Sequence, residues 1–146
     1  MEIIQSPVYL DTNIFIYAIE GHDEYYDLLV HLFSHIEKHN ITVITSELTL
    51  AECLVKPEKD QNIEAIEQYK NHIKTNSQMT VKTVSRKILV SSARVRSQLG
   101  LKLPDAIHMA TAINESCKTF ITNDKKLRSP ENMKRMTLED LRKLFI

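Results

Sequence analysis

The stretch Pro7-Val-Tyr-Leu-Asp11-Thr-Asn13 joins a short apolar run to an acidic residue, and the expected fold follows from it. Residues 7–10 are predicted to form a short buried strand, because the run is apolar and brief. Residues 12–20 are predicted to form a helix or helical turn that ends near Gly21. Asp11 therefore lies where a strand ends and a helix begins, which is the edge at which parallel sheets bind ligands.

The rest of the chain repeats this alternation of strand and helix. Further strands are predicted at residues 41–45, 79–84 and 119–122, and helices at residues 24–39, 46–55, 58–75, 85–100, 103–113 and 137–145. Pro57 is expected to end the helix that Ser46 caps. Alternation at this spacing predicts an α/β fold with a short central parallel sheet and helices on both of its faces.

Length and composition favour one soluble domain spanning residues 1–146. The chain has 146 residues, of which 42% are hydrophobic, so it can bury a core of its own. It has no apolar run of about 18 residues, and its first residues lack the basic start of a signal peptide, so we expect a cytoplasmic protein that does not enter a membrane. Cys53 and Cys117 are far apart in the sequence and are expected to be reduced, buried thiols.

Charge is balanced over the whole chain but divided between its halves. Residues 1–81 carry 13 acids and 5 bases, whereas residues 82–146 carry 6 acids and 14 bases, giving net charges of −8 and +8. This division is compatible with a basic face for phosphate groups beside an acidic site. Attraction between the halves, or pairing of subunits, would explain it equally well.

Four acids lie at boundaries between predicted elements, namely Asp11, Glu52, Asp105 and Asp124. Any one of them alone is better explained as a helix cap, a turn residue or a surface charge. Together they could reach one edge of the sheet, where two unit charges 4 Å apart would repel by about 4 kcal/mol at an effective dielectric near 20. A hard divalent cation removes that repulsion, and a ligand set made only of oxygen suits Mg²⁺ or Mn²⁺ better than Zn²⁺.

These motifs resemble the PIN-domain family of metal-dependent ribonucleases, and in particular the small VapC-like toxins of bacterial and archaeal toxin–antitoxin pairs. The resemblance covers nearly the whole chain and is carried by residues 9–13, 46–52, 100–112 and 122–124. It implies a PIN-like fold in which the four acids bind one or two Mg²⁺ or Mn²⁺ ions. It also implies hydrolysis of RNA by water, leaving 3′-hydroxyl and 5′-phosphate ends, with a homodimer and a cognate antitoxin as partners.

The same resemblance implies that Thr12 or Asn13, together with Thr122, supports the carboxylates through hydrogen bonds. Four basic or imidazole side chains are candidates for contact with RNA: Arg94, Arg96, Lys102 and His108. Exposed charges on helices are usually only solvated, and a His one turn from a carboxylate is more often a structural partner than a proton shuttle or an RNA contact.

Two other functions compete with the ribonuclease interpretation. A phosphatase of the haloacid dehalogenase type also begins with an acid after its first strand, but it needs a second Asp two positions later, where this chain has Asn13. A catalytically inactive PIN-fold module that only binds RNA or a protein is the stronger alternative. The complete set of four acids argues against it, because folding alone does not require four mutually repelling carboxylates at one sheet edge.

Overall fold

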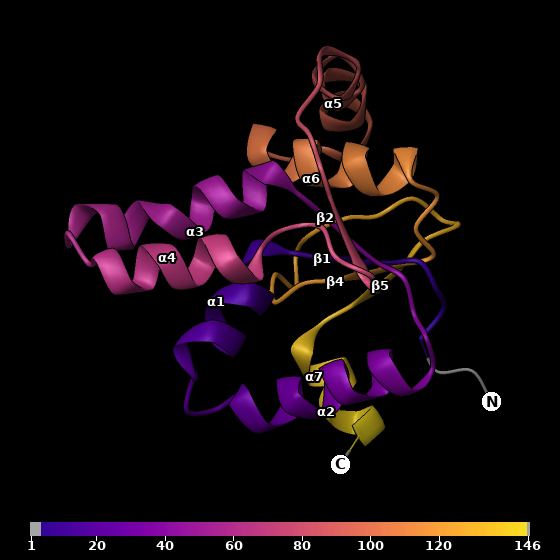
Figure 1. Ribbon diagram of the computed structural model, residues 1–146. Coiled ribbons are helices and arrows are strands. Elements are labelled where there is room, and N and C mark those ends of the chain that lie inside the picture. The colour runs from indigo at the N-terminus through magenta and orange to yellow at the C-terminus, as the bar shows by residue number, and fades with distance from the viewer. Residues whose placement is uncertain (1–3, 146) are drawn as a thin grey trace.

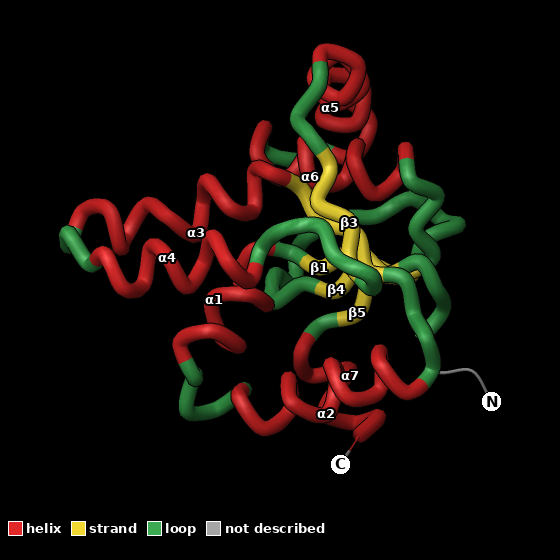
Figure 2. Tube along the Cα trace, in the orientation of Figure 1, coloured by secondary structure: helices red, strands yellow, loops and turns green. Residues whose placement is uncertain are grey.

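A parallel sheet with the strand order β3-β2-β1-β4-β5 forms the centre of the molecule. The computed structural model describes residues 4–145, and its path is shown in Figures 1 and 2. The strands are β1 (Val8–Leu10), β2 (Val43–Ser46), β3 (Met79–Lys82), β4 (Thr119–Ile121) and β5 (Lys134–Met136).

Helices cover both faces of this sheet, as predicted. They are α1 (Thr12–Glu20), α2 (Tyr26–Lys38), α3 (Glu47–Lys59), α4 (Ile63–His72), α5 (Arg86–Leu99), α6 (Leu103–Asn114) and α7 (Leu138–Phe145). In Figure 1, α1, α2 and α7 lie below the sheet and α5 and α6 above it, while α3 and α4 run side by side away from the sheet. Among the residues described, no helix is both long enough and apolar enough to cross a membrane.

Alternation along β1 divides the core into two parts. Val8 and Leu10 belong to the cluster beneath α1, α2 and α7, whereas Tyr9 belongs to the cluster beneath α5 and α6. Successive side chains of a strand point to opposite faces, so even this three-residue strand contributes to both clusters. All three residues are fully buried, as expected for the central strand of a parallel sheet covered on both sides.

The order in which strands are added to the sheet reverses beside β1. The chain passes outward from β1 to β2 and β3, then returns to place β4 on the other side of β1 and β5 beyond it. The carboxyl ends of β1 and β4 therefore flank the switch point, which is where open α/β sheets bind their ligands. The Asp11 N–H donates to the Ile121 carbonyl at 3.0 Å, which holds these two strand ends together.

Helix ends agree with the predicted caps in several places. The Ser46 hydroxyl accepts from the Leu48 N–H at 3.0 Å, and the Ser85 hydroxyl accepts from the Ile88 N–H at 3.2 Å. Gly21 and Gly100 end α1 and α5 with φ values of 68° and 67°, a left-handed conformation that strongly favours glycine.

Two predictions about the elements are wrong. Pro57 does not end its helix but lies buried inside α3, near the C-terminal end, where its fixed φ fits a helix and only one hydrogen bond is lost. The next helix begins at Ile63 rather than at residue 58, because the Asn62 side chain caps it by accepting from the Ala65 N–H at 3.1 Å. Strand β5 was not predicted, since it is a short edge strand in which only Met136 is buried.

Candidate active site

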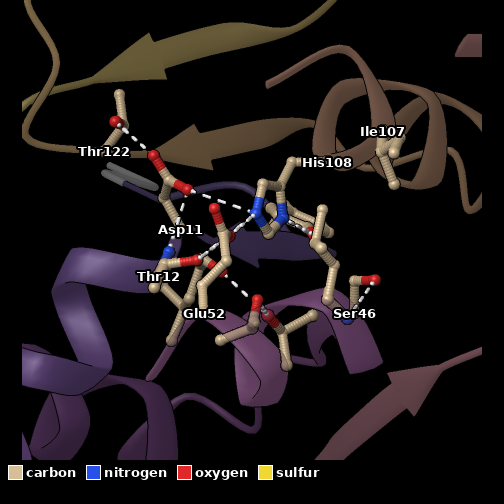
Figure 3. A network of polar contacts seen from close by, with 12 residues as sticks. Asp11, Thr12, Ser46, Glu52, Ile107, His108 and Thr122 are labelled. Atoms are coloured by element: carbon tan, nitrogen blue, oxygen red, sulfur yellow. Dashed lines mark hydrogen bonds and ion pairs between the residues drawn. The ribbon is translucent and has the colours of Figure 1, made fainter. Parts of the chain in front are cut away.

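Four different elements bring the predicted acids to the switch point. Asp11 directly follows β1, Asp124 lies three residues after β4, Glu52 comes from α3, and Asp105 lies in the first turn of α6. Their charges act on one another, because Asp11, Asp124 and Glu52 all raise the pKa of Asp105. The four predicted acids are therefore close enough to influence one another electrostatically, and Figure 3 shows the part of this region around Asp11 and Glu52.

Asp11 joins β1, α1 and β4. It caps α1, and its Oδ1 accepts from the Thr12 N–H at 2.8 Å. Its Oδ2 accepts from the Thr122 hydroxyl at 2.7 Å, and that hydroxyl in turn accepts from the Asp124 N–H at 3.0 Å. Thr122 therefore orients the first acid, as Figure 3 shows, which is the contact that the resemblance implied for it. It also holds the loop that carries the fourth acid.

Glu52 is held by two donors on a single oxygen. Its Oε1 accepts from the Thr12 hydroxyl at 2.7 Å and lies 2.6 Å from Nε2 of His108 (Figure 3). Burial alone would raise the pKa of Glu52, but the hydrogen bonds from His108 and Thr12, with the electrostatic effect of the nearby His108 ring, bring it below its usual value. Glu52 is therefore ionised at neutral pH, and 36% of its side chain is exposed.

Asp105 has the opposite electrostatic environment. Burial makes the largest contribution to its raised pKa, followed by the negative charge of Asp11, while His108 acts in the other direction. Smaller contributions from Asp124 and Glu52 raise the pKa further. An acid whose charged form is disfavoured by its neighbours is a place where a cation would be stabilised.

A buried polar pair, Tyr9 and His108, lies next to the acids. Of the two, only His108 is among the predicted site residues. His108 is 2% exposed, and its Nδ1 lies 2.6 Å from the hydroxyl of Tyr9, which is fully buried. Burial, together with the nearby Asp11, raises the pKa of Tyr9 well above its usual value, so the phenol stays protonated. These contacts favour the structural-partner interpretation of His108 over direct contact with RNA. Tyr9 itself was predicted only as part of a buried strand.

The remaining predicted residues lie on the surface. Asn13 is exposed in the first turn of α1, whereas Thr12 makes the contacts to the acids. Arg94 and Arg96 are exposed on α5, and Lys102 is exposed immediately before α6. These three cations are accessible to a phosphate backbone, and their positions agree with either a solvated surface or an RNA contact.

The donor set fits a hard divalent cation by its chemistry. It consists of four carboxylates, and the imidazole nearest to them already has its ring nitrogens committed to Tyr9 and Glu52. Oxygen donors of this kind are the ligands that Mg²⁺ and Mn²⁺ prefer. Within residues 4–145, however, no three His, Cys, Asp or Glu side chains are already arranged as a coordination sphere. Cation binding would therefore require some of these carboxylates to move.

Solved structures with the same fold include three toxins or toxin–antitoxin complexes. VapBC2 from Rickettsia felis, bound to a DNA fragment from its promoter, is 24% identical with a TM-score of 0.70, covering 89% of this chain and 97% of that one. A toxin–antitoxin complex from Klebsiella pneumoniae is 23% identical with a TM-score of 0.66, covering 90% and 97%. The sarcin-ricin loop cleaving toxin VapC20 of Mycobacterium tuberculosis is 14% identical with a TM-score of 0.63, covering 77% and 86%.

At these identities the structural likeness establishes the fold alone. No curated protein matches the sequence. The model of the PIN domain, by contrast, matches residues 8–132, a range that begins with β1 and contains all four acids. The fold and the family match agree, and the chain belongs to the PIN-domain family.

Proposed function

We propose that the protein is a Mg²⁺- or Mn²⁺-dependent endoribonuclease that hydrolyses phosphodiester bonds of RNA and serves as the toxin of a toxin–antitoxin pair. The observation that supports this most is electrostatic: the charges of Asp11, Asp124 and Glu52 all raise the pKa of Asp105. Asp11 and Asp124 follow the two strands that flank the switch point of the parallel sheet. An uncompensated acidic site would repel RNA phosphates, whereas a cation held there would attract them.

The ligands of the cation would be Asp11, Glu52, Asp105 and Asp124. When bound, a divalent cation supplies positive charge that lowers the pKa of a water and offsets charge on the phosphate. The chain itself supplies orientation: the Thr122 hydroxyl fixes Asp11, and the Thr12 hydroxyl fixes Glu52.

Water is the nucleophile in this proposal. Burial raises the pKa of both Cys53 and Cys117 to about 12, so neither thiol is ionised at neutral pH. The Thr12 hydroxyl is already engaged, since it donates a hydrogen bond to Oε1 of Glu52. Attack by water at phosphorus, with the 3′-oxygen as leaving group, gives the 3′-hydroxyl and 5′-phosphate ends that the family resemblance implies.

The toxin role is supported by the functions of proteins that share this fold. The Rickettsia felis and Klebsiella pneumoniae structures are toxin–antitoxin complexes, and the Mycobacterium tuberculosis protein is a toxin that cleaves the sarcin-ricin loop. By analogy, the partner of this chain is an antitoxin, its substrate is a cellular RNA, and it acts in the cytoplasm as a homodimer.

Cleavage of a mixed panel of single-stranded and structured RNAs, with Mg²⁺, Mn²⁺ or EDTA, tests the proposal. The wild type should cut at least one RNA only when metal is present, and Asp11→Asn should remain folded but not cut. Asp23→Asn is the matched control, since it removes the same charge from an exposed position in the α1–α2 connection. Cleavage that survives in EDTA or in Asp11→Asn would refute the mechanism, and RNA binding without cleavage would favour the inactive binding module.

A further inference from the structure

A continuous series of polar contacts joins Tyr9, His108 and Glu52, and it runs from the core of the sheet to the edge of the site. The Tyr9 hydroxyl lies 2.6 Å from Nδ1 of His108, and Nε2 of the same ring lies 2.6 Å from Oε1 of Glu52. Tyr9 is fully buried and His108 is 2% exposed, so water cannot take the place of either partner. Three elements meet in this series: β1 supplies Tyr9, α6 supplies His108 and α3 supplies Glu52.

The direction of the hydrogen bonds follows from the last acceptor. An ionised carboxylate can only accept, so Nε2 of His108 must carry a proton at this short distance. In the neutral ring Nδ1 then has a lone pair, and the Tyr9 hydroxyl is the donor that fills it. The phenol therefore selects the tautomer that donates to Glu52.

Tyr9 and His108 are held firmly by packing. The Tyr9 ring stacks on Phe120 of β4, with ring centroids 4.9 Å apart and an interplanar angle of 15°. His108 is enclosed on α6 between buried neighbours, because residues 106–112 of this helix are all buried. Glu52, by contrast, has a flexible side chain that is 36% exposed, so its position depends on the groups that hold its carboxylate.

We propose that Tyr9 and His108 are positioning residues that fix Oε1 of Glu52, so that Oε2 is presented to a divalent cation in the site. Within residues 4–145 the hydrogen bonds of this carboxylate from Thr12 and His108 both go to Oε1. A ligating carboxylate that is itself hydrogen-bonded is pre-oriented, and loss of such a supporting contact typically costs about 10–100-fold in metal affinity or activity. The inference rests on the proposed metal-dependent function.

Metal affinity tests the role of the imidazole without any RNA. Mn²⁺ titration followed by electron paramagnetic resonance should show binding by His108→Leu weakened by about 10–100-fold. His108→Gln should recover most of the lost affinity, because its amide can donate to Glu52 from nearly the same place. Thr111→Val is the control: Thr111 is buried on the same helix, and its hydroxyl donates to the Ile107 carbonyl rather than to the site.

The two proposals fail in different ways. A wild type that binds Mn²⁺ and cuts RNA, with a folded His108→Leu that binds Mn²⁺ equally tightly, would overturn the positioning role alone. A wild type that binds no Mn²⁺ would overturn the proposed metal-dependent function and this inference with it.

Nitrogen NMR of the metal-free protein tests the hydrogen-bond directions on which the inference rests. Nε2 of His108 should carry a slowly exchanging proton in the wild type, and Tyr9→Phe should shift the ring toward a mixture of tautomers. A wild-type ring without a proton on Nε2, or a Tyr9→Phe spectrum identical to that of the wild type, would overturn the assignment.

Discussion

Removing the Tyr9 hydroxyl should destabilise the fold, because it leaves a buried nitrogen of His108 without a hydrogen-bond partner. In Tyr9→Phe the ring can keep its stack on Phe120, so no sizeable cavity forms. What is lost is the 2.6 Å hydrogen bond to His108, at a place where neither partner meets solvent. Nδ1 of His108 is then left as a buried acceptor without its donor.

The expected cost follows from that burial. A buried polar group that loses its partner costs about 1–3 kcal/mol, so we expect the free energy of unfolding to fall by about 2 kcal/mol. For a chain of this size, that loss corresponds to a decrease in Tm of roughly 4–8 °C. The exposed Tyr26 offers the control, because Tyr26→Phe removes a hydroxyl that water already surrounds and should leave stability unchanged.

Urea unfolding followed by circular dichroism measures this cost, since the chain has no Trp to report by fluorescence. In a His108→Leu background, Tyr9→Phe should instead raise the free energy of unfolding. The Tyr9 hydroxyl has no imidazole to pair with there, so the substitution removes a buried donor that lacks an acceptor. Equal stability of Tyr9→Phe and wild type, or an equal cost in both backgrounds, would refute the reasoning that the two side chains are coupled.

Two further predictions concern titratable groups. Burial, then the charge of Asp11, raises the pKa of Asp105 above its unfolded value, so the folded protein binds that proton more tightly. The resulting stability is present at low pH and is lost as pH rises from about 4, the unfolded value, through the raised pKa. In EDTA, Asp105→Asn should therefore gain stability over the wild type across that window, and a pH-independent difference would contradict this. Burial raises the pKa of Cys53 and Cys117 to about 12, so both thiols should resist a disulfide reagent near pH 8 until urea unfolds the chain; rapid labelling of the native protein would show the burial to be wrong.

Much of the fold could be predicted from periodicity and caps. The central strands are apolar, and their alternation with helices predicts a parallel sheet. Ser46 and Ser85 begin α3 and α5, and Gly21 and Gly100 end α1 and α5. Strand β5 could not be predicted in this way. Its residues Lys134 and Arg135 have no apolar alternation, and pairing with β4 alone makes it an edge strand.

The boundary between α3 and α4 shows the limit of a local rule. Pro57 usually marks the end of a helix, but its ring is buried here, so tertiary packing offsets the missing hydrogen bond. The start of α4 depends on the Asn62 side chain, whose cap lies five residues beyond the proline at which a local rule places the boundary.

The sequence likewise predicts some residues of the site and not others. The sequence places the four acids at or near boundaries between elements, and their role as cation ligands stays a prediction. Tyr9 could not be predicted, because an aromatic residue in a buried strand is indistinguishable from ordinary core until its hydroxyl is seen beside His108, 99 positions along the chain. Only the folded structure brings such a pair together.

Calorimetric titration with Mn²⁺ tests the central claim most directly, namely that four distant carboxylates form one cation site. The wild type should bind Mn²⁺, and Asp11→Asn and Asp124→Asn should each weaken binding, whereas Asp23→Asn should leave it unchanged. Absence of Mn²⁺ binding by the wild type, or equal affinity in all four proteins, would contradict the account.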